Sequence, residues 1–270
     1  VAFNVNSDLF AKLSEKQADE FRQAISLLID RNYIVETVGQ TGQVVADSFI
    51  PEGMSDGNGG KYEASYFDAT KTGADNAKKA MKLLEDCGYS FTDKGDGTYS
   101  VSPAISIPYI LNDDSGHQKV AECIQQDLAV VGIDMTISSE EWNTFLDDRK
   151  AGNYTFAREG WLADYNDPIN MLELFTSDSG NDDPQLGVGT SSSAPQWSEY
   201  ESMIDEIHKT TDVAKRTELI KKAEKTLMDT YAVIPIYYYN DIFMQKRNVD
   251  GIYSTIFFIY YFMYATKTAK

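Results

Sequence analysis

The sequence predicts an α/β fold with parallel strand pairing, and three consecutive segments support this. An apolar run at 105–111 is typical of a buried strand. The next segment, 115–131, carries apolar residues at helical spacing and stops at Gly132. An alternating segment, 133–137, then indicates a second strand. A strand, a helix and a strand in this order predict a βαβ unit whose strands pair in parallel.

Further helices are predicted on both sides of this unit. Ser14 and Gln17 have the spacing of a capping box, which marks a helix start. Gly88 stands where a glycine commonly follows the end of a helix. On these signals and on apolar spacing, helices are expected at 14–31, 34–38, 75–86, 142–151, 170–175, 199–210 and 213–230.

Short strands and loops are expected to fill the remaining sequence. Strands are predicted at 1–6, 99–101, 154–157 and 232–239. Segment 44–54 leads into the glycine-rich turn 57–60, so we expect a loop without core structure there. Segment 177–195 is rich in Ser, Gly, Asn and Asp and predicts a long surface loop. Within it, residues 181–183 are expected to be simply solvated.

Composition and charge narrow the function classes. With 42% apolar residues over 270 positions, the chain is long enough to bury a core. The 24 basic and 42 acidic residues give a net charge of -18, which repels nucleic acid phosphates. Nucleic acid is therefore not an expected partner. Cys87 and Cys123 both lie in helical patterns, which favours buried thiols over the alternative of one disulfide.

The two ends of the chain carry separate signals. The start lacks the charged and apolar regions of a signal peptide, which indicates an intracellular protein or an internal fragment. The tail 252–264 is apolar and aromatic, but it is shorter than the roughly 20 residues of a membrane helix. We expect a core or interface strand there, with membrane anchoring as the alternative.

The sequence shows no catalytic or metal-binding motif. His117 and His208 lack a nucleophile elbow or a catalytic cysteine pattern nearby, and their separation predicts no zinc site. Phosphate-binding glycine loops are absent, and segment 164–167 lacks the later glycine and glutamate of a calcium loop. We therefore expect no metal, no cofactor and no enzyme activity.

Segment 158–168 carries the strongest functional signal. Its sequence, Arg158-Glu-Gly-Trp-Leu-Ala-Asp-Tyr-Asn-Asp-Pro168, follows a predicted strand, and ligands of α/β proteins gather at strand ends. Opposite charges beside aromatic walls suit a zwitterionic ligand. The segment resembles the Gly-Trp-x-Ala-Asp-Tyr-Asn-x-Pro core of bacterial extracellular solute-binding proteins of the peptide/nickel class. Further similar segments are 22–31, 77–89, 117–121, 132–133, 141–146 and 223–239.

The resemblance implies a fold and a function for the chain. The fold is α/β and periplasmic-binding-protein-like type II, with 1–250 as the C-terminal lobe of a two-lobed clamshell. Residues 251–270 form an apolar segment expected to return toward the missing N-terminal lobe. The implied function is to bind oligopeptides by their amino terminus and deliver them to the membrane permease of an ABC importer. The implied location is the extracellular membrane face, by a lipid anchor, or the periplasm.

The resemblance also implies roles for individual residues. Asp164 is expected to pair with the ligand's α-ammonium group. Arg158 and His117 are expected to meet its carboxylate. The remaining expected ligand-binding residues are the aromatic Trp142, Trp161 and Tyr165.

Simpler explanations exist for the same residues. Asp164 is also placed to cap a helix before Pro168. Arg158 is also placed for a surface ion pair with Glu159 or another acid, and the two tryptophans fit plain core aromatics. Glu159 stands where the related motif commonly has a small residue, and its charge is expected to weaken a carboxylate anchor at Arg158.

Two other functions fit the sequence less well. Relatives of this class bind nickel complexes, haem or oligosaccharides, although Asp164 favours a ligand with a free amine. A carboxylate-based hydrolase that uses Asp164 and Asp167 belongs to a different class, and no catalytic pattern supports it.

Overall fold

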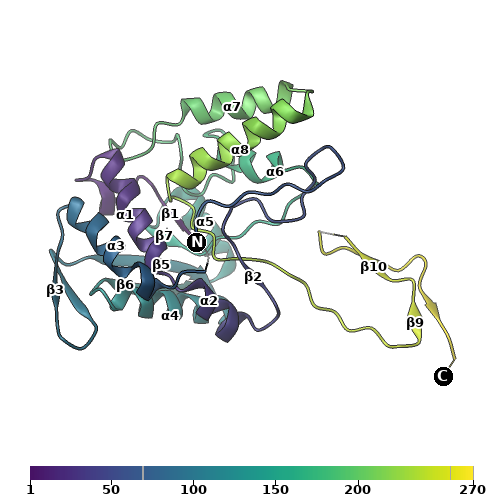
Figure 1. Ribbon diagram of the computed structural model, residues 1–270, viewed down its shortest axis with the longest axis horizontal. Helices are drawn as coiled ribbons and strands as arrows, with labels where there is room; N and C mark the ends of the chain where they lie inside the picture. Colours follow the sequence, from purple (N-terminus) through teal and green to yellow (C-terminus); the bar gives the residue numbers. More distant parts are fainter. Residues whose placement is uncertain (69, 256, 270) are drawn as a thin grey trace.

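The main sheet has four strands. The computed structural model describes residues 1–68, 70–255 and 257–269. The strand order is β1 (Ala2–Phe3), β7 (Phe156–Ala157), β5 (Ser106–Asn112) and β6 (Asp134–Glu140). Strand β5 pairs in parallel with β6 and β7, and β1 is antiparallel to β7. Helix α4 (Ser115–Ala129) connects β5 to β6, so the predicted βαβ unit is confirmed (Figure 1).

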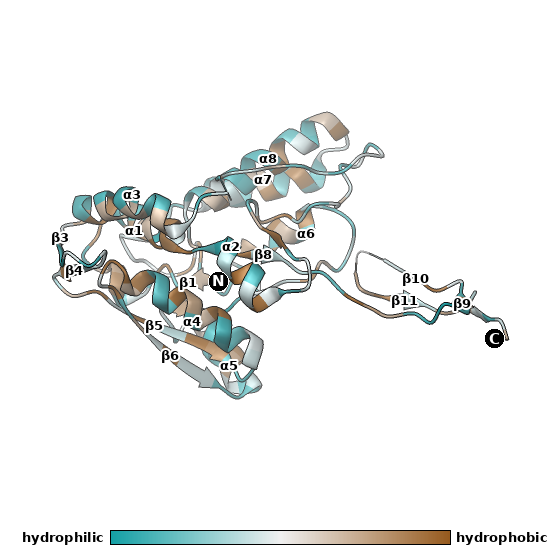
Figure 2. Ribbon diagram, turned by 60° about the horizontal axis from the view of Figure 1, so that its bottom comes forward, coloured by the Kyte–Doolittle hydropathy of each residue, from teal (hydrophilic) through white to brown (hydrophobic). Residues whose placement is uncertain are grey.

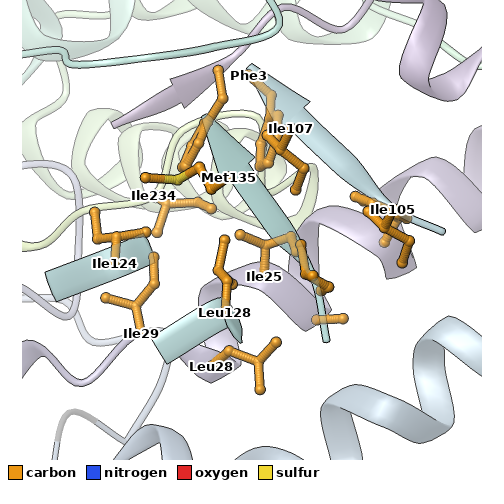
Figure 3. Close-up of a cluster of buried hydrophobic side chains, with 14 of the residues drawn as sticks. Phe3, Ile25, Leu28, Ile29, Ile105, Ile107, Ile124, Leu128, Met135 and Ile234 are labelled. Atoms are coloured by element: carbon orange, nitrogen blue, oxygen red, sulfur yellow. The ribbon is translucent and has the colours of Figure 1, made fainter. Parts of the chain in front are cut away.

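The larger core lies between one face of this sheet and three helices, α1 (Glu15–Leu28), α3 (Gly73–Asp86) and α4. In Figure 3, Phe3, Ile107 and Met135 from the strands surround a space that Ile25 and Leu128 also enter from the helices. Each of the five is at most 1% exposed. Full burial of such a side chain contributes about 1.5–3 kcal/mol, so this interface holds the helices on the sheet.

Helix α1 ends earlier than the sequence predicts. It stops at Leu28, and the chain enters α2 (Arg31–Ile34) and the π-helix η2 (Val35–Gly39). The guanidinium of Arg31 turns inward and donates to the carbonyl oxygens of Ser26 at 2.9 Å and Pro235 at 2.8 Å. The predicted end at Arg31 is therefore wrong, because the Asp30 N–H, which would bond the Ser26 carbonyl in a continuing helix, donates to Asp127 instead, and the Arg31 side chain takes that carbonyl.

A second core lies under α6 (Ile169–Leu172), the 3-10 turn η3 (Glu173–Phe175), α7 (Ser198–Lys209) and α8 (Val213–Asp229). The segment expected to lack core structure contributes the buried side chains Ile50 and Met54 to it. That expectation is wrong, because the backbone N–H groups of Phe49 and Ile50 donate to buried Glu224 of α8, at 3.0 and 2.7 Å.

The remaining elements are short. Strand β3 (Ser90–Asp93) forms a hairpin with β4 (Tyr99–Ser102), and α5 (Trp142–Ala151) covers the other face of the sheet through Phe145. In the predicted strand 232–239, Val233 forms an antiparallel bridge with Ala2 of β1, and Tyr237–Tyr238 form β8, which pairs with β2 (Val44–Val45). Cys87 and Cys123 are free and pack at the larger core, so the packing prediction is confirmed and the disulfide alternative is wrong.

The tail extends away from this body (Figure 2). It carries four two-residue strands, β9 (Val249–Asp250), β10 (Tyr253–Ser254), β11 (Tyr260–Tyr261) and β12 (Thr266–Lys267). Several of its apolar side chains are exposed, including Ile259 at 51% and Met263 at 71%. The tail is not a core strand of this body, and an interface strand stays a prediction. Within the described ranges, no helix has the length and apolarity to cross a bilayer.

Candidate functional site

A cavity of about 630 Å³ opens at the carboxyl ends of the parallel strands. Each of the three strands leads directly into one lining residue. Strand β5 leads to His117 in the first turn of α4, β6 to Trp142 at the start of α5, and β7 to Arg158. Parallel strands place their carboxyl ends at one edge, which is where open α/β sheets bind ligands.

Arg158 is a cation without a carboxylate partner among the described residues. Its backbone N–H donates to the Ile110 carbonyl at 2.9 Å, which continues the sheet by one bond. Its Nη2 donates to the Tyr239 hydroxyl at 3.1 Å, and its buried Nε has no partner in the described chain. The alternative of a surface ion pair with Glu159 is wrong, because Glu159 pairs with Arg149. Arg158 keeps donors for an anionic group.

The Glu159 carboxylate belongs to a buried ion-pair cluster. Arg149, near the end of α5, contacts Glu159 Oε2 at 2.7 Å and Asp183 Oδ2 at 3.1 Å. Asp182 and Asp183 are only 4% and 6% exposed. The expectation that residues 181–183 are solvated is therefore wrong for both aspartates, whereas Asn181 is exposed as expected. Arg149 and the Tyr154 hydroxyl, which donates to the Asp183 carbonyl at 2.6 Å, hold this loop against the sheet.

Asp164 lies on the loop that walls one side of the cavity, but its own side chain is exposed and outside the lining. Buried Asn170 holds this loop, since its Oδ1 accepts from the Asp164 N–H at 2.8 Å and from Trp161 Nε1 at 3.3 Å. In the described part of the chain, no cation lies within 4 Å of the Asp164 carboxylate. The helix-cap alternative is wrong, because Asp167 accepts from the Ile169 N–H at the start of α6.

The predicted aromatic residues separate into two groups. Trp161 lines the cavity and packs against the second core, so its core explanation is partly retained. Trp142 also lines the cavity but is 46% exposed, which rules out a plain core role. Tyr165 is 42% exposed, donates to Glu173 and lies outside the lining. Phe257, from the tail, reaches the edge of the same cavity.

His117 is a neutral member of the site. Burial lowers the pKa of its ring, and the nearby charge of Arg158 lowers this pKa further. A neutral imidazole supplies a hydrogen bond rather than a charge at pH 7, so Arg158 is the main cation at this edge. In the ranges that the structure covers, no three His, Cys, Asp or Glu side chains are grouped to hold a metal ion.

Sequence reasoning missed three residues that shape the site: Arg149, Asp183 and Asn170. Each makes its contacts through a buried polar side chain. Asn170 lies only six residues from Asp164 and nine from Trp161, so an amide on the helix after the aromatic segment was a usable local signal. Arg149 and Asp183 had no such signal, since a lone arginine in the last turn of a helix ordinarily lies in solvent.

Comparison with known proteins places the chain among binding proteins. Bacterial extracellular solute-binding proteins, family 5 (middle region), match residues 1–183. The dipeptide-binding protein DppE of Bacillus subtilis is 31% identical over 255 residues, which are 93% of this chain and 41% of DppE. The chain thus spans about two fifths of the length of this curated relative.

Solved structures share the fold. The Haemophilus influenzae OppA complex with RPPGFSPFR is 27% identical, with a TM-score of 0.69 over 88% of this chain and 42% of OppA. A solved peptide-binding protein of a peptide ABC transporter, 23% identical, has a TM-score of 0.67 over 87% of this chain and 96% of its own. A chain of lobe size therefore exists as a solved structure with this fold.

Proposed function

The chain belongs to the bacterial extracellular solute-binding proteins of family 5, and from this premise we propose that it binds oligopeptides by their amino terminus for an ABC importer. Its fold is that of one lobe of a type II periplasmic binding protein. DppE is named a dipeptide-binding protein, and the OppA structure is a complex with the peptide RPPGFSPFR, which supports a receptor rather than an enzyme.

One observation carries the proposal: the cavity edge has an unpaired cation, and the loop beside it has an unpaired carboxylate. Arg158 makes no ion pair within the described residues, and neither does Asp164. A peptide has an ammonium at one end and a carboxylate at the other, so these two groups match its ends. Trp142, Trp161 and the neutral His117 supply walls between them for apolar side chains.

The structure disfavours the hydrolase alternative. A pair of acids would have to include Asp167 beside Asp164, but Asp167 already forms an ion pair with Arg216 at 2.9 Å and accepts from the Ile169 N–H at 3.0 Å. An acid fixed by a cation and a helix end is not free to move a proton. A nickel complex, haem or an oligosaccharide lacks the free amine that the Asp164 carboxylate suits.

The division of the chain is part of the proposal. Residues 1–250 are proposed to form the C-terminal lobe, and 251–270 to return to an N-terminal lobe of the same polypeptide. Exposed apolar tail residues such as Phe262 and Met263, at 63% and 71%, support this, because an apolar surface of this kind is normally covered. The receptor is proposed to act at the extracellular membrane face, lipid-anchored, or in the periplasm, and to hand peptides to a membrane permease.

The amino-terminal anchor is tested by Asp164→Asn in the full-length protein. Loss of one partner of an enclosed charge pair costs about 2–5 kcal/mol, so affinity for free-amine peptides should fall more than about tenfold in calorimetry. N-acetylated peptides, which lack the ammonium, should bind wild type and variant equally. Asp178→Asn, at an exposed aspartate elsewhere on the surface, is the matched control. Equal affinities of free-amine peptides for wild type and Asp164→Asn would remove Asp164 from the site.

The two-lobe arrangement is tested by comparing this 270-residue chain with the full-length protein on one peptide pool. The chain should fold, because both cores are complete within it. It should bind poorly, since water around a one-sided site reduces an ion pair to about 0–1 kcal/mol. Submicromolar binding by the chain alone would show that one lobe suffices.

A further inference from the structure

The ion-pair cluster beside the cavity forms a nearly closed ring of three side chains. Arg149 contacts one oxygen of each acid, Glu159 Oε2 through Nη1 and Asp183 Oδ2 through Nη2. The other two oxygens, Glu159 Oε1 and Asp183 Oδ1, are buried, and no donor for them lies in the described chain. Both carboxyl groups thus converge on one guanidinium, and each keeps one buried oxygen without a partner from the described part of the chain.

Two carboxylates that share one arginine leave one negative charge uncompensated in the protein interior. Burying an unpaired charge is costly, and two acids in contact do not both ionise readily. One proton between Glu159 Oε1 and Asp183 Oδ1 solves both problems, because it removes the extra charge and gives each orphaned oxygen a partner. Arg158 does not compensate the extra charge through an ion pair, since its guanidinium has no carboxylate within 4 Å in the part of the chain that the structure describes.

We propose that Glu159 and Asp183 share one proton over Arg149, and that this proton keeps the cavity beside Arg158 selective for a carboxylate of the ligand. The inference rests on the proposed function, because it concerns the acidic end of the peptide. With the proton in place, the three-residue cluster is neutral, and Arg158 sets the sign of the local potential. Without it, the cluster carries one negative charge next to the anion that Arg158 holds.

Among the titratable groups beside the cavity, the shared proton is the main one that is lost when the pH rises above 7. Burial raises the pKa of Glu159 to about 8, against the lowering effects of Arg149 and Arg158. In the proposed two-lobe protein, the Val1 nitrogen near Glu159 belongs to a peptide bond, so it carries no charge above pH 7. His117 is neutral there as well. Exposed Lys150 contributes a further positive charge that acts on Asp183.

Asp182 is the one neighbour that needs its own control. Burial raises its pKa to about 8, with the charge of Asp183 adding to the rise. It does not line the cavity, and it forms no part of the ring around Arg149. An Asp182→Asn variant should therefore keep the pH dependence of peptide binding, whereas changes within the ring should remove it.

The proton is tested first without any ligand. Infrared difference spectra of the full-length protein should show a carboxylic acid signal at pH 7 that disappears as the pH rises through about 8. The part of the signal that comes from the shared proton should be lost in Glu159→Gln, whose amide donates to Asp183 in place of that proton, and in the reciprocal Asp183→Asn, whereas the part that comes from Asp182 should remain in both. It should persist in part in Asp182→Asn. No acid signal attributable to Glu159 or Asp183 at pH 7 would overturn the inference, whatever the protein binds.

The second test measures the affinity of one free-carboxylate peptide at pH 7 and pH 9.5. Between pH 7 and pH 9.5 the wild type gains one negative charge in the cavity wall, whereas Glu159→Gln does not. The affinity of the wild type for this peptide should therefore fall about tenfold more than that of Glu159→Gln. The peptide's own amine titrates identically with both proteins and cancels in this comparison. The C-terminally amidated peptide should show no such difference. An equal pH effect in wild type and Glu159→Gln would refute the selectivity role, whereas no peptide binding at any pH would refute the proposed function and leave the infrared result standing.

Discussion

Replacing Glu224 with alanine should detach the loop 44–54, which contributes to one wall of the cavity, from helix α8. The Glu224 side chain is fully buried on α8 and accepts four hydrogen bonds. Two come from the backbone N–H groups of Phe49 and Ile50, and two from the hydroxyls of Tyr62, at 2.6 Å, and Tyr66, at 2.9 Å. The same loop contributes Phe49 to the cavity lining.

The magnitude follows from the groups left without an acceptor. Each buried donor that loses its partner costs about 1–3 kcal/mol; the hydrogen bonds from Ile50 and Tyr62 are buried, and those from Phe49 and Tyr66 are partly buried. Part of this loss of stability is offset. Burial raises the pKa of Glu224, which means that keeping its carboxylate ionised in the folded protein costs free energy. We expect Glu224→Ala to lower the free energy of unfolding by about 3–5 kcal/mol. Glu224→Gln keeps one carbonyl oxygen for the backbone donors and should lose about 1–2 kcal/mol.

Urea unfolding followed by circular dichroism measures these differences. Glu218→Ala is the matched control, since Glu218 is an exposed glutamate on the same helix, and it should change stability by no more than about 0.5 kcal/mol. Calorimetry on the full-length protein should also show weaker peptide binding for Glu224→Ala. If Glu224→Ala and Glu218→Ala unfold at the same urea concentration, the hydrogen bonds of Glu224 do not hold the loop.

Three more outcomes are expected. Arg158→Ala should weaken short peptides more than long ones, because only one peptide length spans from Asp164 to a fixed carboxylate anchor; equal losses over a tri- to pentapeptide series in calorimetry would make Arg158 structural. Gly132→Ala should lower the melting temperature more than Gly97→Ala, because both have positive φ but only at Gly132 does a new Cβ lie 2.7 Å from a backbone oxygen. Burial raises the Asp127 pKa from 3.8 to about 6, so the stability it gives is present below pH 4 and lost as the pH rises through 6. Asp127→Asn should therefore gain about 1 kcal/mol in urea unfolding at pH 7, and no gain at pH 3.5.

Local patterns in the sequence determined the elements of the chain and their order. The strand–helix–strand order of residues 105–137 predicted the parallel pairing of β5 and β6. This was possible because the spacing of apolar residues and the signal that ends a helix both lie within a short stretch of sequence. The capping box of Ser14 was likewise visible locally and is present. The segment 158–168 indicated the region of the proposed site for the same reason, since its motif is contiguous.

Tertiary structure alone decided how the polar groups of the site are paired. The sequence suggested that Glu159 would neutralise Arg158, its neighbour in the chain, yet Arg149 takes that carboxylate and Asp183 joins it. Loops that looked solvated proved buried for the same reason, as with Asp183 and with Ile50. Buried polar contacts join residues distant in the chain and have no sequence period, and each exists only because folding removes water from both partners at once.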